Sequence, residues 1–124
     1  MQWLAVAAGG ALGALGRYGL NGLVYHYSSL RFPLGTLLAN VIGSALMGVM
    51  FVLIIERGIL PPIWREFFMI GVLGAFTTFS TFSLETLTLW HNGQPLMALG
   101  YVLANVTLCL LFTLGTIGLT RMLY

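Results

Sequence analysis

Four apolar stretches, each about as long as a membrane-spanning helix, constrain this chain more than any other feature. A helix needs roughly 20 apolar residues to cross the hydrocarbon core of a bilayer. The expected spans cover residues 3 to 26, 32 to 55, 64 to 90 and 95 to 119. Because 59% of the 124 residues are hydrophobic and 6% are charged, they cannot cover a water-soluble surface. We therefore predict an all-α membrane protein with four transmembrane helices in a single domain, residues 1–124.

The residues near the ends of these spans fit a bilayer interface. Tryptophan and tyrosine gather there, as aromatic belts require: Trp3, Tyr25, Tyr27, Trp64, Trp90 and Tyr124. His26 and His91 fall in expected turns, where interfacial anchoring is more common than metal binding. Small residues four apart, such as Gly9 with Gly13 and Ala39 with Gly43, predict close contacts between helix backbones. The net charge of +2 rests on five arginines, so it indicates membrane topology rather than nucleic-acid binding.

The third span contains the run GAFTTFSTFS at residues 74–83, which a plain transmembrane helix would not contain. Hydroxyl groups in hydrocarbon need partners, and clustered Ser and Thr next to glycine loosen a helix by competing for its backbone groups. Such a segment is expected to be buried in protein or to face water. The sequence therefore predicts that the third helix is broken near its middle, where transporters and channels commonly hold ions.

Three polar residues inside the apolar spans are candidates for function. Arg17 either extends its side chain toward the nearer interface or attracts anions into a vestibule. Asn40 carries a neutral amide that either bridges helices or contacts an anion. Glu85 is the only acid well inside a span, and it is either a proton-relay carboxylate or a structural group capped by hydroxyls such as Thr81, four residues before it.

Two phenylalanines and two serines on the third helix suggest an anion site. Phe79 and Phe82 are three residues apart and share one side of the helix, with Ser80 and Ser83 in a neighbouring row. Ordinary core packing explains two such rings equally well. Ring edges carry the positive part of the quadrupole and hydroxyls donate hydrogen bonds, so together they can hold an anion without a fixed charge. No nucleophile, metal-ligand or phosphate-loop spacing is present, so we do not expect an enzyme.

A mildly polar stripe on the fourth span has four-residue spacing and so occupies one helical face. It consists of Tyr101, Asn105, Cys109 and Thr113. The single cysteine, Cys109, is expected to be a small buried side chain.

Three motifs resemble the small fluoride channels of the CrcB, or Fluc, family: GALGRY at 13–18, FPLGTLLAN at 32–40 and GAFTTFSTFSLE at 74–85. The resemblance covers the whole chain in length and in the order of its four helices. It implies an antiparallel homodimer whose subunits insert in opposite orientations, with dual topology. It also implies two fluoride pores along the dimer interface and a central structural sodium ion bound by backbone carbonyls. The family is expected in the bacterial plasma membrane.

The same resemblance assigns roles to individual residues. Phe79 and Phe82 resemble the pore phenylalanines, and Asn40 resembles the pore asparagine. The carbonyls of Gly74 and Thr77 would bind sodium. Further residues would line or support the fluoride pathway: Ser80, Thr81, Ser83, Tyr101, Glu85 and, at its vestibule, Arg17. The fourth span matches less tightly, because Asn105 and Cys109 stand where serines would be unsurprising.

The expected function is therefore passive exit of fluoride from the cytoplasm. A small proton-coupled exporter that uses Glu85 is the alternative, but exporters resembling the multidrug type carry their acid in the first helix, which has none here. A purely structural subunit does not explain why hydroxyls and rings concentrate at one break. Arginines number three on one expected side and two on the other, so orientation is weakly biased and both orientations should insert.

Overall fold

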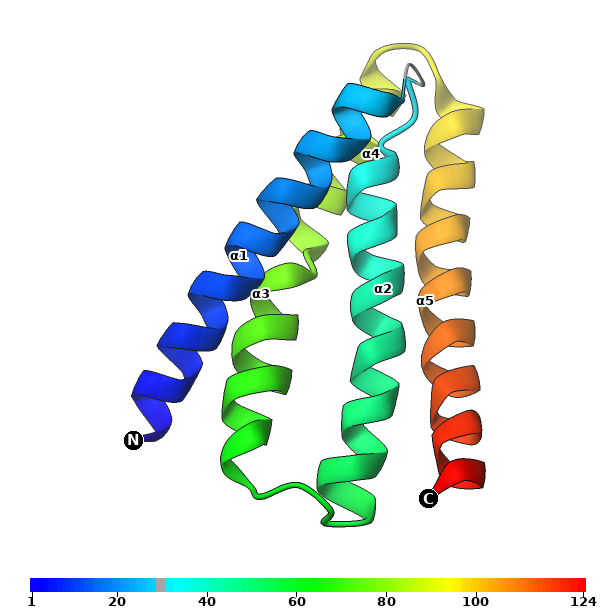
Figure 1. The fold of residues 1–124 in the computed structure, drawn as a ribbon. Helices are drawn as coiled ribbons and strands as arrows, with labels where there is room; N and C mark the ends of the chain where they lie inside the picture. Colours follow the sequence, from blue (N-terminus) through cyan, green and yellow to red (C-terminus); the bar gives the residue numbers. More distant parts are fainter. Residues whose placement is uncertain (29–30) are drawn as a thin grey trace.

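The computed structural model describes residues 1–28 and 31–124, and these residues form helices joined by short connections, without a strand. The elements are α1 (Gln2–Tyr27), α2 (Leu34–Met50), η1 (Phe51–Glu56), η2 (Arg65–Leu73), α3 (Gly74–Phe76), α4 (Phe79–His91) and α5 (Pro95–Leu123). They make four rods, because η1 continues α2 as a π-helical end, and η2, α3 and α4 follow one another (Figure 1). The expected turn after the first helix includes Ser29, which lies outside the described residues.

Three of the four rods are long and apolar enough to cross a membrane. They cover Leu34–Glu56, Arg65–His91 and Pro95–Leu123. The helix α1 is 26 residues long, which is sufficient to span a bilayer. The mean hydropathy of α1 is lowered by its glycines, Arg17 and Asn21. For this reason α1 is not one of the three helices that qualify as spans. The prediction of four helices is thus confirmed in number, and by length and composition three of them qualify as spans.

The two chain termini lie at the same end of the bundle. The connection between η1 and η2 lies at that end too, and the connections that precede α2 and α5 lie at the opposite end (Figure 1). The end with the termini holds Arg57 and Arg65 beside the η1–η2 connection and Arg121 in the last turn of α5.

Glycines allow the helices to approach closely within the protomer. Gly9 and Gly13 on α1 are buried, and a Cβ at either position would collide with a backbone carbonyl, that of Phe67 or of Val72. On α2, a Cβ at Gly43 would collide with the Thr77 side chain. The close contacts predicted from the small-residue spacing therefore join α1 to η2 and α2 to the third rod.

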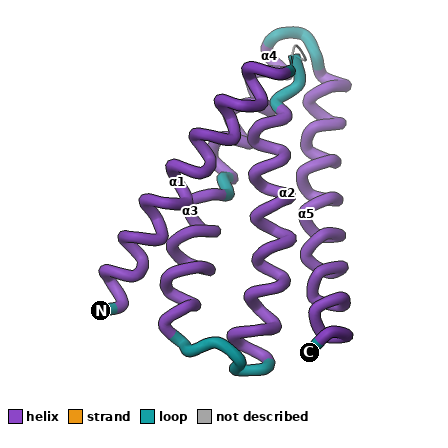
Figure 2. Tube along the Cα trace, viewed as in Figure 1, coloured by secondary structure: helices purple, strands orange, loops and turns teal. Residues whose placement is uncertain are grey.

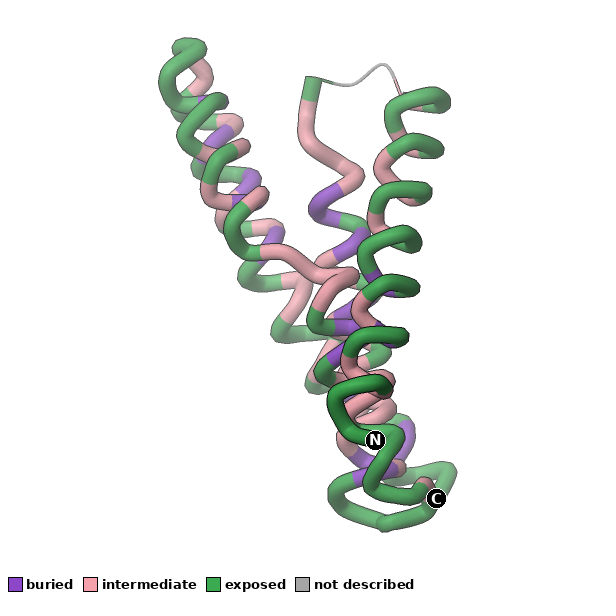
Figure 3. Tube along the Cα trace, turned by 90° about the vertical axis from the view of Figure 1, so that its left-hand side faces the viewer, coloured by how far each residue is buried: buried purple, intermediate pink, exposed green. Residues whose placement is uncertain are grey.

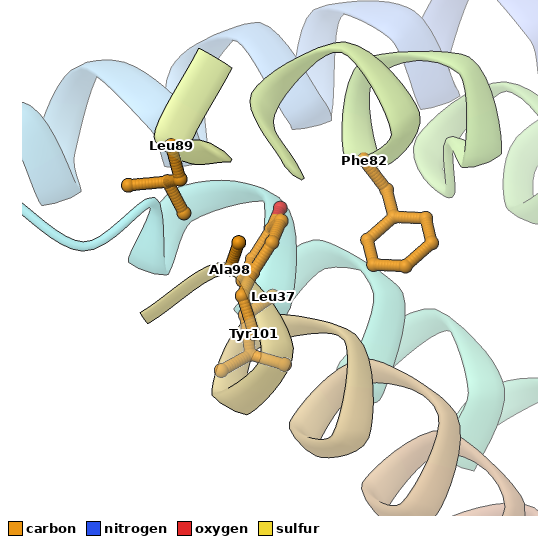
Figure 4. Close-up of a cluster of buried hydrophobic side chains, with 5 residues drawn as sticks. All are labelled: Leu37, Phe82, Leu89, Ala98 and Tyr101. Carbon is orange, nitrogen blue, oxygen red and sulfur yellow. The ribbon is translucent and has the colours of Figure 1, made fainter. Parts of the chain in front are cut away.

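The buried core is small and lies where α2, α4 and α5 meet. Its members are Leu37, Phe82, Leu89, Ala98 and Tyr101, shown in Figure 4. Many of the remaining residues are exposed, as the green segments of Figure 3 show, and many of the exposed side chains are apolar. Leu96 and Leu110 on α5 are 84% and 66% exposed, and the span-end residues Trp3 and Tyr25 are each 89% exposed. Such faces need a bilayer or a partner subunit to cover them.

Candidate functional site at the break in the third helix

The third helix breaks at two threonines. The α3 turn ends at Phe76, Thr77 and Thr78 are extended with ψ of 156° and 122°, and α4 starts at Phe79. Figure 2 shows this as a short loop inside the rod. The predicted break is confirmed, and it occupies only a small part of the run at residues 74–83, since Gly74 before it has helical backbone angles (φ −62°, ψ −36°).

Two backbone N–H groups at the break donate to side chains instead of to the preceding turn. The Thr78 N–H donates to Asn40 Oδ1 at 2.8 Å, whereas in a continuous helix it would donate to the Gly74 carbonyl. The Thr81 N–H donates to Thr78 Oγ1 at 3.3 Å, which caps α4. In a continuous helix the Thr81 N–H would donate to the Thr77 carbonyl. The carbonyls of Gly74 and Thr77 are thereby deprived of their usual helical donors.

Asn40 on α2 holds the break in place from outside the third rod. In addition to accepting from Thr78, its Nδ2 donates to the Thr78 carbonyl at 3.1 Å and to Asn105 Oδ1 at 3.0 Å. Asn105 lies on α5, is 5% exposed, and donates to the Tyr101 carbonyl at 3.1 Å. Of the two roles considered for Asn40, the structure shows helix bridging, and its contact with an anion stays a prediction. In the sequence, Asn105 could be recognised as a candidate because it lies four residues after Tyr101, on the same face of the fourth span.

Glu85 is capped by two hydroxyl groups. Thr36 Oγ1 donates to Glu85 Oε1 at 2.9 Å, and the buried Tyr101 hydroxyl donates to Glu85 Oε2 at 2.5 Å. The capping groups come from α2 and α5, whereas sequence spacing suggested Thr81 on the same helix. Each carboxylate oxygen thus accepts one hydrogen bond, so Glu85 ties α4 to both neighbouring helices.

Phe79 and Phe82 touch each other but have different surroundings. Their ring centroids are 5.3 Å apart with planes tilted by 59°. Phe82 is 7% exposed and packs against Tyr101 with centroids 5.4 Å apart, whereas Phe79 is 77% exposed. Figure 4 shows Phe82 at the edge of the core cluster. Phe82 is therefore a core residue within the protomer, and Phe79 projects away from it.

The hydroxyl groups of Ser80, Thr81 and Ser83 on α4 make hydrogen bonds within the protein to different extents. Ser83 Oγ donates to the Phe79 carbonyl at 2.9 Å, one turn earlier. Thr78 Oγ1 donates to Thr81 Oγ1 at 3.1 Å, and Ser80 Oγ lies 3.4 Å from Thr78 Oγ1 on the exposed side. The Ser80 hydroxyl is the most accessible of this row, because that residue is exposed and the others are half-buried.

A groove of about 390 Å³ runs between α2, α4 and α5 at the level of the break. It brings together Asn40, both phenylalanine rings and Asn105. Its walls are Asn40, Gly43, Ser44, Met47, Thr77, Thr78, Phe79, Phe82, Asn105, Val106, Cys109, Leu110 and Thr113. The polar stripe predicted on the fourth span thus contributes Asn105, Cys109 and Thr113, and Cys109 is half-buried.

Several expected site residues lie outside this groove. Tyr101 and Glu85 are connected to it through Asn105, whereas Arg17 is half-buried on α1 and lines no wall of it. Within the described residues, no three His, Cys, Asp or Glu side chains cluster as metal ligands.

The chain is similar to known proteins over nearly its whole length. The profile of the family described as "CrcB-like protein, Camphor Resistance (CrcB)" matches residues 4–118. A protein of Saccharophagus degradans named "Fluoride-specific ion channel FluC" is 53% identical over 121 residues, covering 98% of this chain and 90% of that protein. Proteins of the same name from Magnetococcus marinus and Hahella chejuensis are 48% and 46% identical, covering 90% and 95% of this chain and 90% and 93% of theirs. This membrane protein therefore belongs to the CrcB family.

Proposed function

We propose that this chain forms a fluoride-selective channel through which fluoride leaves the cytoplasm passively. The observation that carries the proposal is the groove at the helix break, which combines phenyl rings with amide and hydroxyl groups. The names of its relatives, which describe an ion channel and not an enzyme, support the same conclusion. Fluoride and the lipid bilayer are then the partners of this chain, with the bacterial plasma membrane as its location.

The groove suits weak and repeated binding of a small anion. None of its lining residues carries a charge. A fixed cation in such a low-dielectric site would hold fluoride too tightly for release, because charge attraction increases severalfold there. The ring edges of Phe79 and Phe82, with their electropositive hydrogens, replace part of the hydration shell. Asn40, Ser80 and Thr81 complete the polar pathway, with Ser83, Tyr101 and Glu85 along or behind it and Arg17 at its vestibule.

The pores lie at the interface of an antiparallel homodimer. Phe79 is 77% exposed in the protomer although it lines the groove, so a second copy must cover it if it is to face an enclosed pore. The near balance of arginines at the two ends allows both orientations to insert. Single cysteines introduced into each connection of a Cys109→Ser background test this. Labelling of every site from both sides is expected, and labelling from one side only would defeat the dual-topology proposal.

A sodium ion at the dimer centre is the proposed structural cation. The carbonyls of Gly74 and Thr77 fit this role, because their usual helical donors are directed to Asn40 and to Thr78 Oγ1. Carbonyl oxygens are suitable ligands for an alkali cation at a helix break. Thermal unfolding of the purified protein in sodium, in potassium and in a large organic cation tests the site. A higher unfolding temperature in sodium supports it, and equal temperatures in all three contradict it.

Anion efflux from liposomes tests the function itself. Vesicles loaded with fluoride or with chloride, and containing the purified protein, should release fluoride far faster than chloride. Protein-free vesicles and a Phe79→Ile variant serve as controls. A flux that requires a pH gradient would instead favour the proton-coupled exporter, and the absence of fluoride efflux would refute the channel.

A further inference from the structure

We propose that Arg31 forms an anion-gathering mouth beside Glu85, at the end of the bundle where α4 and α5 are joined. Asn92 and Gln94 supply further polar groups there. The inference rests on the proposed channel function and assigns the ligand class as a small hydrated monovalent anion. It gives a role to Arg31, which lies neither at the helix break nor in the wall of the groove.

The mouth is a pocket of about 600 Å³, separate from the groove at the break. Its walls are Arg31, Pro33, Leu84, Glu85, Thr88, Leu89, Asn92 and Gln94. These residues come from the segment before α2, from α4, and from the connection to α5. Glu85 also borders a pocket of about 370 Å³ that reaches Asn21 and Tyr25 on α1. Glu85 in the wall of the mouth is linked by hydrogen bonds, through Tyr101 and Asn105, to the groove residue Asn40.

The two charges at the mouth have opposite signs and differ in how they are paired. Arg31 and Glu85 are the two charged residues in its wall. Glu85 already accepts one hydrogen bond at each oxygen, from Thr36 and Tyr101, so its carboxylate is solvated by the protein. Arg31 is exposed and has no hydrogen-bond or ion-pair partner within residues 1–28 and 31–124, so its charge is available to an ion.

The helix ends around the pocket add smaller fields of opposite sign. Gln94 precedes the 29-residue α5, whose N-terminus carries partial positive charge. The C-terminus of α4, next to Asn92, carries partial negative charge. These two ends have opposite signs and add little net field, so the exposed guanidinium of Arg31 is the positive group that an entering anion can contact.

Ionic strength distinguishes a gathering charge from a structural one. A unit charge about 7 Å from an ion, in surroundings as polar as water, raises the local anion concentration about threefold. The Debye length is about 30 Å at 0.01 M salt and about 3 Å at 1 M, so the effect disappears at high salt. Fluoride efflux through Arg31→Gln, measured in neutral phosphatidylcholine vesicles, should fall about threefold at the low ionic strength and match the wild type at the high one.

Two further variants serve as controls. Arg31→Lys keeps the charge and should keep the flux. Arg57→Gln removes an exposed arginine that lines none of the three pockets, so its flux should not change. Size-exclusion profiles of all variants show whether they fold as the wild type does.

Each other outcome overturns the inference. If Arg31→Gln reduces fluoride efflux equally at both ionic strengths, Arg31 has a structural role. If the efflux is unchanged at both, Arg31 does not contribute to the fluoride pathway. A loss seen only in vesicles of anionic lipid would make it a lipid-headgroup anchor. If the wild type itself carries no fluoride, the proposed function fails first, and that result is separate from any comparison among variants.

Discussion

Replacing Asn40 by leucine removes the amide that holds the helix break while keeping a side chain branched at Cγ. Three hydrogen bonds are lost, and they leave the Thr78 N–H, the Thr78 carbonyl and the Asn105 side-chain oxygen without their partner. Hydrogen bonds between transmembrane helices average about 0.6 kcal/mol each, so the loss is at least about 2 kcal/mol. Leaving a buried polar group unpaired costs about 1–3 kcal/mol, which for three groups gives about 3–9 kcal/mol. Because these groups are only part-buried, we expect the loss to lie at the lower end, about 2–4 kcal/mol.

Unfolding of the purified protein in detergent, followed by the fluorescence of its three tryptophans, measures this loss. The matched control is Ile42→Ala, two residues along α2, where the side chain is 41% exposed and makes no such bonds. A double-mutant cycle with Asn105→Leu should give a coupling of about 0.6–1.7 kcal/mol for the amide pair. A free energy of unfolding for Asn40→Leu within about 0.5 kcal/mol of the wild type would refute the reasoning.

Three other predictions concern the rings, the glycine contacts and the capped acid. Phe79→Ile and Phe82→Ile should both reduce fluoride flux sharply, but only Phe82→Ile should lower the free energy of unfolding, by about 1 kcal/mol, because only that ring is buried; wild-type flux in both folded variants would reduce the rings to packing. Gly13→Val should destabilise the fold by about 1–3 kcal/mol because its side chain would meet a backbone carbonyl, whereas Gly19→Val, with nothing within 4 Å of its Cβ position, should be nearly neutral; equal effects in thermal unfolding would contradict this packing. Glu85→Gln should lower the free energy of unfolding by about 1 kcal/mol, since an amide cannot accept from both capping hydroxyls at separate oxygens; unchanged stability would contradict the capping role.

The sequence predicted the helical class because its apolar stretches are long and nearly free of charge. In hydrocarbon every backbone polar group must be paired within the chain, which leaves helices as the simplest solution. The same rule located the break, since a run of hydroxyls next to Gly74 competes with the helix for its own backbone groups. Helix spacing also placed Phe79 and Phe82 side by side, and their rings are in contact.

Only the tertiary structure decided which side chains form hydrogen bonds with the backbone at the break. Asn40 is 38 residues from Thr78 in sequence, and Asn105 is 65 residues from Asn40. Thr36 and Tyr101 are likewise distant from Glu85, to which both donate. Hydrophobic periodicity and local spacing report only on neighbours within one helix. Partners from different helices are set by how the rods pack, and that packing depends on close approaches, such as Gly43 against Thr77, that a linear pattern does not specify.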